Sequence, residues 1–461
     1  MVEKLGIPTV SIIGSGFVKQ AQVVIKGLGV PLAVGVYPGA PMVDGDAELA
    51  AKVEKNLAPE LVAGLTRDLA RPAAPARADS EPARGQIVFS GNFDEVQDYF
   101  HEQLWSDGLP VVPPTRERVH AFLEYTDRSA DDVFLIAPPE GREASIYSIA
   151  VNGVMAGCRP EYMPVLIAIV EAMCDPNFRL EDAGSTPGWE PMVVVSGTII
   201  KELNLNYGQG VMRAGRQANT SIGRFMRMYL RNVCGYRIPP GAGDKGSIGQ
   251  NFIVALAEDE DSAAQLGWST FGEDCGFAQG ENAVTVQSVV CISPPLYSAG
   301  DTALGHVQQF TDILSRVFAY GCYSGVKRGF WTPLIIVGPG IAQVIAREWS
   351  KDKVKTYLWE NMTIPASLMK HFCWQTAATT IDFSKLVEEG TLPERYAASD
   401  DPDRPIPMIV QPDHIGLVVA GDPERNQSRG YMSNNTQGSR TSRRVVLPKR
   451  WPELLARHKS H

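Results

Sequence analysis

The chain has 461 residues, of which 44% are hydrophobic and 21% charged, as in an ordinary globular protein with room for two or three domains. Its formal net charge of −9 argues against a dedicated nucleic-acid binder. No apolar run reaches the roughly 18 residues of a membrane span, and the first residues, MVEKLG, lack the apolar core of a signal peptide.

The cysteines and histidines show no metal-binding spacing. The seven cysteines are scattered, with no CxxC pair and no regular framework, so we expect reduced thiols and a cytoplasmic location. None of the seven histidines has HxH or HExxH spacing, so we expect no histidine-rich metal site. The sequence indicates no particular cofactor.

Residues 1–70 have the pattern of a small βαβ module. Apolar spacing predicts, in order, a strand at Pro8–Ile13, a helix at Phe17–Leu28, a strand at Val30–Tyr37 and a helix at Ala47–Leu65. The turn Gly14-Ser15-Gly16 lacks the third glycine of the dinucleotide fingerprint and has no Walker lysine. We interpret it as a tight strand-to-helix turn rather than a nucleotide site.

Residues 71–85, RPAAPARADSEPARG, form a Pro/Ala-rich linker to a large α/β body. The body contains an apparent duplication, because PGWEPMVVVSG (187–197) matches GFWTPLIIVGPG (329–340). Upstream, EASIYSIAVNG (143–153) parallels ENAVTVQSVVCIS (281–293), and a helix is predicted after each, at about 160–174 and 303–320. HIGLVVAGD (414–422) predicts a further strand. We therefore expect two similar halves, 86–278 and 279–461, with a ligand site where they meet.

The segment GVMAGCRPEYMPV places Cys158 just before a predicted helix that begins near Pro160. Unpaired N–H groups and the helix dipole lower the pKa of a thiol at such a position, and Arg159 adds positive charge, so Cys158 is a candidate nucleophile. The alternative is a small buried cysteine in a glycine-flanked turn. Cys275, in the polar segment GEDCGFAQGEN, is a weaker candidate because two carboxylates precede it. The other five are expected in the core: Cys174, Cys234, Cys291, Cys322 and Cys373.

A second candidate site lies in GQGVMRAGRQANTSIGRFMRMYLRN (208–232). Asn219 and Thr220 are predicted to cap a helix, and an anion such as a carboxylate could bind there beside Arg213 and Arg216. The following glycine-rich loop adds Asp244 and Lys245 as possible ligand contacts. The alternative is a basic helix face, formed by Arg224, Arg227 and Arg231, that pairs with acidic groups or with another subunit.

The C-terminal run RNQSRGYMSNNTQGSRTSRRVVLPKR (425–450) is basic and contains no acid. It is expected to be either an ordered lid that begins with Arg425 and Asn426 and contacts an anion or a subunit, or a disordered segment. His414, before the last predicted strand, is a candidate general base, although a lone histidine is more often structural. The sequence leaves open whether carboxylates such as Asp182, Glu190 and Asp244 hold a metal.

EKLGIPTV, a predicted helix and VGVYPGAPM resemble the stretch after the redox motif in the UGSC family of (seleno)proteins. The resemblance to selenoprotein B of the glycine reductase type is more distant. The body also resembles the long C-terminal region of larger UGSC-family proteins, through the segments SGNFDEVQDYF, WSDGLPVVPPT, VNGVMAGCRPEYMPV, DAGSTPGWEP, GRQANTSIGRF, IPPGAGDKGSIGQNF and QSVVCISPP. The sequence begins after the family's UGSC or CGSC turn and has no cysteine before Cys158, so the reactive selenolate or thiolate has no counterpart here.

This resemblance implies a subunit of a thiol- or selenol-dependent oxidoreductase or lyase that acts on a carbon–heteroatom (C–S, C–N or C–halogen) bond of a small anionic metabolite. A partner chain would supply the redox turn, or Cys158 would replace it. The alternatives are a thiol-based hydrolase or transferase without redox change, and a non-catalytic metabolite-binding scaffold. We expect a homo- or hetero-oligomer, and neither nucleic acid nor a membrane as partner.

Overall fold

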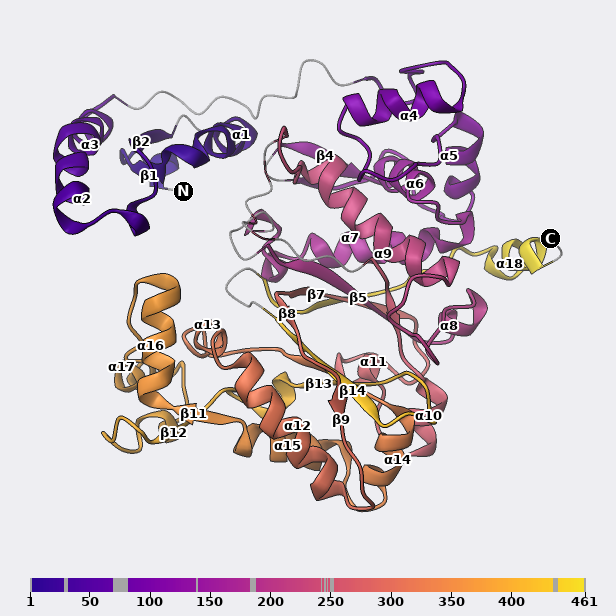
Figure 1. Ribbon diagram of the computed structural model, residues 1–461. Coiled ribbons are helices and arrows are strands. Elements are labelled where there is room, and N and C mark those ends of the chain that lie inside the picture. Colours follow the sequence, from indigo (N-terminus) through magenta and orange to yellow (C-terminus); the bar gives the residue numbers. More distant parts are fainter. Residues whose placement is uncertain are drawn as a thin grey trace.

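The computed structural model describes residues 2–28, 32–68, 82–137, 140–182, 188–241, 243, 246, 248, 253–433 and 438–459. These residues form a mixed α/β structure, as expected from the sequence, and its strands are divided among several small sheets. A small N-terminal lobe lies beside a larger body (Figure 1). None of the described helices is long and apolar enough to cross a membrane.

The N-terminal lobe contains one pair of parallel strands. Strands β1 (Val10–Gly14) and β2 (Ala33–Tyr37) pair in parallel, and helix α1 (Val18–Leu28) lies between them in the chain. Helices α2 (Asp46–Lys52) and α3 (Ala58–Leu65) follow, separated by one π-helical turn. The elements agree with the sequence prediction, except that Val30, the expected start of the second strand, lies outside the described residues.

The glycine turn after β1 is closed by the turn after β2. The backbone N–H of Gly39 donates to Ser15 Oγ at 3.1 Å. A Cβ atom at Gly14 would approach the carbonyl oxygen of Gly39 to 2.9 Å, so a larger residue would push the two turns apart. This close contact supports the interpretation of Gly14-Ser15-Gly16 as a strand-to-helix turn.

The first sheet of the body has the strand order β15–β7–β5–β6. Its central strand β5 (Glu190–Ser196) pairs in parallel with β6 (Leu256–Ala257) and antiparallel with β7 (Ala283–Val289). Strand β15 (Thr441–Arg444), from the C-terminal end of the chain, pairs with the free side of β7. This sheet therefore combines residues that are about 250 positions apart.

The second sheet repeats this arrangement around β10 (Leu334–Val337). Strand β10 pairs in parallel with β13 (Gly416–Val419) and antiparallel with β14 (Gln427–Met432). The free side of β14 is covered by β8 (Cys291–Ile292) and β9 (Leu296–Tyr297). Strand β8 directly follows β7 of the first sheet, and β15 follows β14 of the second. The chain therefore passes from β7 of the first sheet to β8 at the edge of the second sheet, and from β14 of the second sheet to β15 at the edge of the first.

Helices cover the outer faces of the two sheets (Figure 1). Helices α6 (Ile146–Met155), α7 (Met163–Met173) and α9 (Gln217–Tyr229) lie over the first sheet. Helices α12 (Ala303–Phe318), α14 (Pro339–Ala346) and α15 (Lys351–Asn361) lie over the second. The order of layers is thus helix, sheet, sheet, helix.

Alternate residues of the central strands face different layers. Val193 and Val195 of β5 pack against the helices of the first sheet, whereas Met192 and Val194 belong to a separate cluster between the two sheets. Ile335 and Val337 of β10 face the helices of the second sheet. Because both faces of each central strand are covered, the strands are continuous apolar runs rather than alternating ones.

Shorter elements complete the body. They are α4 (Phe93–Glu102), α5 (Arg116–Leu123), β3 (Val133–Ala137), β4 (Arg142–Ser145), α8 (Ile199–Glu202), α10 (Glu260–Gln265), α11 (Phe271–Asp274), α13 (Cys322–Val326), β11 (Thr363–Pro365), α16 (Ala366–Ala377), α17 (Phe383–Glu388), β12 (Pro405–Pro407) and α18 (Trp451–Lys459).

Two expectations about the body are wrong. Segment 143–153 is the end of β4 followed by helix α6, whereas segment 281–293 is strands β7 and β8, so these segments are not equivalent. Ser145 caps α6 by accepting a hydrogen bond from the N–H of Ser148, which favours the helix over a strand. The described part of the basic run 425–450 is neither a lid nor disordered, because it supplies strands β14 and β15.

The two sheets touch at the carboxyl ends of β6 and β13. The N–H of Asp259 donates to the carbonyl oxygen of Val419 at 2.7 Å. The Glu258 carboxylate accepts from the N–H of Phe271 at 2.6 Å and from the N–H of Val419 at 3.4 Å. Burial raises the pKa of Glu258 to about 8, against the opposing effect of Lys351. A buried carboxyl group thus connects the two sheets.

We predict that Trp451→Ala destabilises the body, because α18 closes the core of the first sheet. The Trp451 side chain is 6% exposed, and its Nε1 donates to Glu202 Oε2 at 2.7 Å. Removing such a buried ring costs about 3–5 kcal/mol. Urea denaturation should show a lower midpoint for Trp451→Ala and little change for the control Trp374→Ala, whose side chain is 58% exposed. Equal midpoints for both variants would contradict this packing.

Candidate functional site

A hollow lies at the carboxyl ends of the parallel strands β10 and β13. Open α/β sheets commonly bind ligands at this position. The turn Gly338-Pro339-Gly340 leads from β10 into α14, with proline at the first helical position. A Cβ atom at Gly340 would approach the carbonyl oxygen of Pro423 to 2.3 Å, so only glycine lets the loop after β13 pack against the start of α14.

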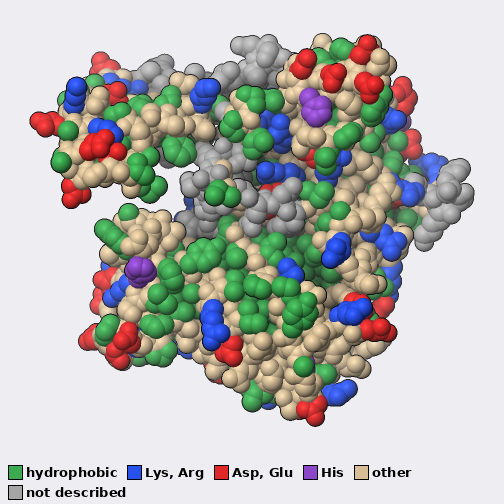
Figure 2. Space-filling model, viewed as in Figure 1, with side chains coloured by type: hydrophobic (Ala, Val, Ile, Leu, Met, Phe, Trp, Pro, Cys, Tyr) green, Lys and Arg blue, Asp and Glu red, His purple; other side chains and the backbone are tan. Residues whose placement is uncertain are grey.

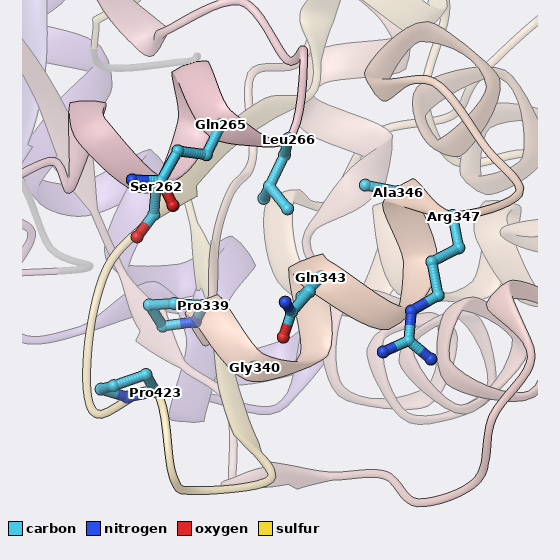
Figure 3. Close-up of a pocket in the computed structure, with 9 residues that line it drawn as sticks. All are labelled: Ser262, Gln265, Leu266, Pro339, Gly340, Gln343, Ala346, Arg347 and Pro423. Atoms are coloured by element: carbon cyan, nitrogen blue, oxygen red, sulfur yellow. The ribbon is translucent and has the colours of Figure 1, made fainter.

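The pocket has a volume of about 510 Å³ and is open to solvent. Helix α14 forms one wall with Gln343 and Arg347, and α10 forms the opposite wall with Ser262, Gln265 and Leu266 (Figure 3). Pro423 closes the end beside the loop after β13. The walls therefore come from three segments that are far apart in the sequence.

The lining of the pocket suits an anion. Gln343 and Arg347 are four residues apart, so both project from one face of α14. Arg347 is exposed, and no carboxylate is among the lining residues. Ser262 Oγ donates to Asp259 Oδ2 at 2.7 Å, so its hydrogen is already used and this hydroxyl offers no donor to an anion. A guanidinium and nearby amide donors can hold a small carboxylate or phosphate group.

The sequence analysis missed Gln343 and Arg347, because no motif marks them. The sequence feature that could have indicated the pocket is the Gly-Pro-Gly turn after an aliphatic strand, which Sequence analysis interprets only as part of the apparent duplication. Arg425 and Asn426, predicted as part of a lid, lie in the loop that borders this pocket. The Arg425 side chain is 73% exposed with Nε 3.5 Å from Asp422 Oδ2, and the carbonyl oxygen of Asn426 accepts from Ser298 N at 3.3 Å.

Of the two alternatives for Cys158, the structure agrees with a small buried cysteine in a glycine-flanked turn and contradicts an acidic nucleophilic thiol. The side chain is only 9% exposed, and its Sγ donates to the carbonyl oxygen of Ser221 at 3.2 Å. Burial raises the pKa of Cys158 to about 12, although the Ser221 contact and the charge of Arg224 oppose this effect. A thiol with this pKa contains almost no thiolate near pH 7.

The remaining six cysteines are buried or half-buried. All seven are free thiols. Burial raises the pKa of both Cys174 and Cys291, and Cys234, Cys322 and Cys373 are buried in the core with raised pKa values. Cys275 is half-buried at the end of α11, and its Sγ accepts a weak hydrogen bond from Thr285 Oγ1 at 3.7 Å.

The predicted anion site at the start of α9 is not formed as expected. The helix begins at Gln217 with Arg216 as its cap residue, so Asn219 lies inside the first turn. The Asn219 amide is fully buried and is used internally: its Nδ2 donates to the carbonyl oxygens of Asn206 and Ala255, both at 2.9 Å. Thr220 Oγ1 accepts from the N–H of Gly215 at 3.1 Å. These groups hold the loop before α9 and are not available to a ligand.

The arginines of this segment divide into paired and exposed ones. Arg224 forms a bidentate ion pair with Asp107, at 2.8 and 2.7 Å. Arg227 Nε lies 3.4 Å from Oε1 of the buried Glu190. Arg231 donates to the carbonyl oxygen of Leu104 at 3.1 Å. The basic face of α9 is thus structural, whereas Arg213 and Arg216, ahead of the helix, are exposed.

His414 has a structural contact, as lone histidines usually do. Its Nδ1 accepts from the N–H of Trp331 at 3.4 Å. Burial, and then the charge of Arg440, lower the pKa of His414. The groups near His414 are Trp331, Arg440 and Asp413, whereas those near Cys158 are Ser221, Arg224 and Glu161, so the two predicted catalytic residues do not form one site.

No predicted metal ligands come together in the described part of the chain. Glu190 pairs with Arg227, and Asp182 pairs with Arg179. No group of three or more His, Cys, Asp or Glu side chains among the described residues could hold a metal ion. Asp244 and Lys245, predicted as ligand contacts, lie outside the described residues.

Comparison of the chain with models of protein families, with curated proteins and with solved structures finds no significant match. Arguments about function therefore depend on the residues of this chain.

We predict that Cys158 is alkylated slowly. Reaction needs both thiolate and access, and burial removes both. Iodoacetamide labelling near pH 7, followed by mass spectrometry, should modify the partly exposed Cys174, Cys275 and Cys291 before the buried Cys158. Denaturation in urea should make the rates converge. Fast, selective labelling of Cys158 in the folded protein would restore it as the nucleophile.

Proposed function

We propose that this chain is the metabolite-binding subunit of a thiol- or selenol-dependent enzyme that acts on a carbon–heteroatom bond of a small anionic metabolite. A partner chain carries the reactive sulfur or selenium, in a UGSC-like or CGSC-like turn. The pocket beside α14 holds the anionic group through Arg347 and Gln343. The single observation that favours this division of labour is the burial of Cys158, which is only 9% exposed although it lies just before a helix start.

The open edge of the N-terminal lobe supports a place for the partner. Among the described residues, β1 pairs only with β2, so its other edge is unpaired. Ile12 on this strand is 58% exposed, and Leu5, Ile7, Met42 and Val43 are also exposed on this lobe (Figure 2). An open aliphatic strand is a template for pairing with another chain. A partner strand that ends in a redox turn fits this edge.

The alternatives are less well supported. A thiol hydrolase or transferase without redox change would need a thiolate, which the burial of Cys158 opposes. A non-catalytic scaffold that binds an anionic metabolite would use the same pocket, and it differs from the main proposal only in lacking the partner. Detection of the partner therefore separates these two candidates.

We also propose that the two sheets descend from a duplicated unit. In each sheet a central strand has one parallel and one antiparallel neighbour, and the exchanged strands β8 and β15 follow equivalent strands. Trp189 and Trp331 both precede the central strand. Each packs edge-on against a phenylalanine. The ring centroids of Trp189 and Phe178 are 5.5 Å apart and the ring planes are at 90°, and the corresponding values for Trp331 and Phe318 are 6.0 Å and 85°.

We predict that Arg347→Ala weakens anion binding about tenfold or more, because a charge-assisted hydrogen bond contributes about 1.5–3 kcal/mol. Isothermal titration with malonate and with inorganic phosphate, at constant ionic strength, measures this effect. Lys385→Ala is the control, since Lys385 is an exposed cation on α17, 3.8 Å from Glu389 and not part of the pocket. Unchanged affinity in Arg347→Ala would exclude the pocket as the anion site.

We predict that Ile12→Lys disrupts the partner complex, because a charge at the open edge opposes strand pairing. The full chain, purified from cells that produce it naturally, should appear by native mass spectrometry with a bound CGSC- or UGSC-bearing protein. The Ile12→Lys variant should lose this protein, and Val62→Lys, which changes an exposed valine of α3, should retain it. A complex that survives deletion of residues 1–70 would refute docking at this edge.

A further inference from the structure

The layer between the two sheets is mainly apolar. It consists mainly of the side chains of Met192, Val194, Leu256, Leu334, Ile336 and Val418. Thr285 and Ser442 face this layer from the first sheet and hydrogen-bond to each other at 2.7 Å. Two further polar side chains, Gln287 on β7 and Arg440 immediately before β15, have unpaired atoms.

The strand register places Gln287 and Arg440 next to each other. Thr441 lies opposite Val286, and the pairing is antiparallel, so the next pair along the ladder is Arg440 and Gln287. Residues directly opposite each other in such a ladder share one face of the sheet. Thr441 faces the helices, since its Oγ1 donates to the carbonyl oxygen of Ala172 in α7. Arg440 and Gln287 therefore face the second sheet.

Both side chains have buried polar atoms without partners. Gln287 is 1% exposed, and neither its Oε1 nor its Nε2 has a hydrogen-bond partner. Nη1 of Arg440 is also buried and unpaired, and Arg440 has no ion pair with any residue in the described part of the chain. Burial of unpaired amide and guanidinium groups costs free energy that native proteins normally avoid.

The surroundings hold the Arg440 guanidinium in one position. Its central carbon lies 5.2 Å from the centroid of the Phe271 ring, which is fully buried. A Cβ atom at Gly416 would lie only 2.7 Å from Nη1, so the guanidinium rests directly against the backbone of β13. Arg440 as a whole is half-buried, so one end of this place reaches solvent.

We propose that Arg440 and Gln287 form a binding site for a small monocarboxylate between the two sheets. The guanidinium pairs with the carboxylate, and the Gln287 amide donates to one of its oxygens. A phosphate dianion fits less well, because the single cation would leave one buried charge uncompensated.

This site is separate from the pocket beside α14 and does not depend on the proposed function. The two sites share no lining residue, and different arginines, Arg347 and Arg440, supply their charges. A variant that abolishes anion binding at one site should therefore leave binding at the other unchanged, so variants of Arg347 and of Arg440 distinguish the two sites.

The test is a titration of the full-length protein with formate, acetate, propionate and butyrate against chloride at equal ionic strength. Binding is followed by calorimetry and by the melting temperature, in the wild type and in Arg347→Ala. We expect propionate to bind and stabilise both proteins. Arg440→Ala and Gln287→Leu should each weaken binding about tenfold or more. Arg444→Ala is the matched control, because Arg444 is on the same strand, 67% exposed and paired with Glu281.

Gln287→Leu gives a second, independent readout. Leucine removes the unpaired amide with little change in volume, so the ligand-free variant should melt about 2 °C higher or more. A lower melting temperature would mean that the amide already has a structural partner and would overturn the proposal. A higher melting temperature together with no carboxylate binding by the wild type would mean that only water occupies the site, which also overturns it.

Discussion

The body depends on one constraint: its central strands are buried on both faces. With helices outside each sheet and the second sheet behind it, a side chain on β5 or β10 has no route to water on either side. Such strands must be almost entirely apolar, and any polar group on them must find a partner inside the protein. This constraint explains both the aliphatic runs and the few buried polar contacts that join the sheets.

The same constraint accounts for the chemistry of the thiols. Cys158 and the core cysteines lie in the layers that exclude water, so their neutral form is favoured, and the local dipole of a helix start does not overcome this cost. Reactivity in this protein therefore has to come from its surface, from the pocket beside α14, or from another chain. Under the proposed function, that chain would dock at the open edge of β1, and the pocket would supply a cation for the metabolite.

Exchange of the edge strands makes the two sheets interdependent. Strand β15 completes the first sheet, although it follows β14 of the second, and β8 completes the second, although it follows β7 of the first. The C-terminal helix α18 continues this return, with Trp451 and Leu454 in the core of the first sheet. A cut through the chain at residue 278 would therefore separate β5 and β6 from β7 and β15 and leave the first sheet incomplete. The same return of the chain places Arg440 beside Gln287.

The local elements followed from the sequence alone, because apolar period and capping residues act over a few positions. The elements of the N-terminal lobe, strands β5, β10 and β13, and helices α7 and α12 all appear where periodicity indicates them. The segment 143–153 was misassigned because a buried helix is apolar on all sides and resembles a buried strand. Its cap, Ser145, was the distinguishing local signal.

Tertiary structure alone decided which residues share a site. The pocket combines α10, α14 and the loop at Pro423, and the buried polar pair combines β7 with a residue more than 150 positions later. The burial of Cys158 and the internal hydrogen bonds of Asn219 likewise depend on neighbours distant in the chain. Short-range patterns fix where a helix begins, but solvent exclusion and strand pairing are set by contacts over long sequence separations. Sequence patterns could therefore identify the elements, whereas the partners and the pKa of each polar side chain required the folded chain.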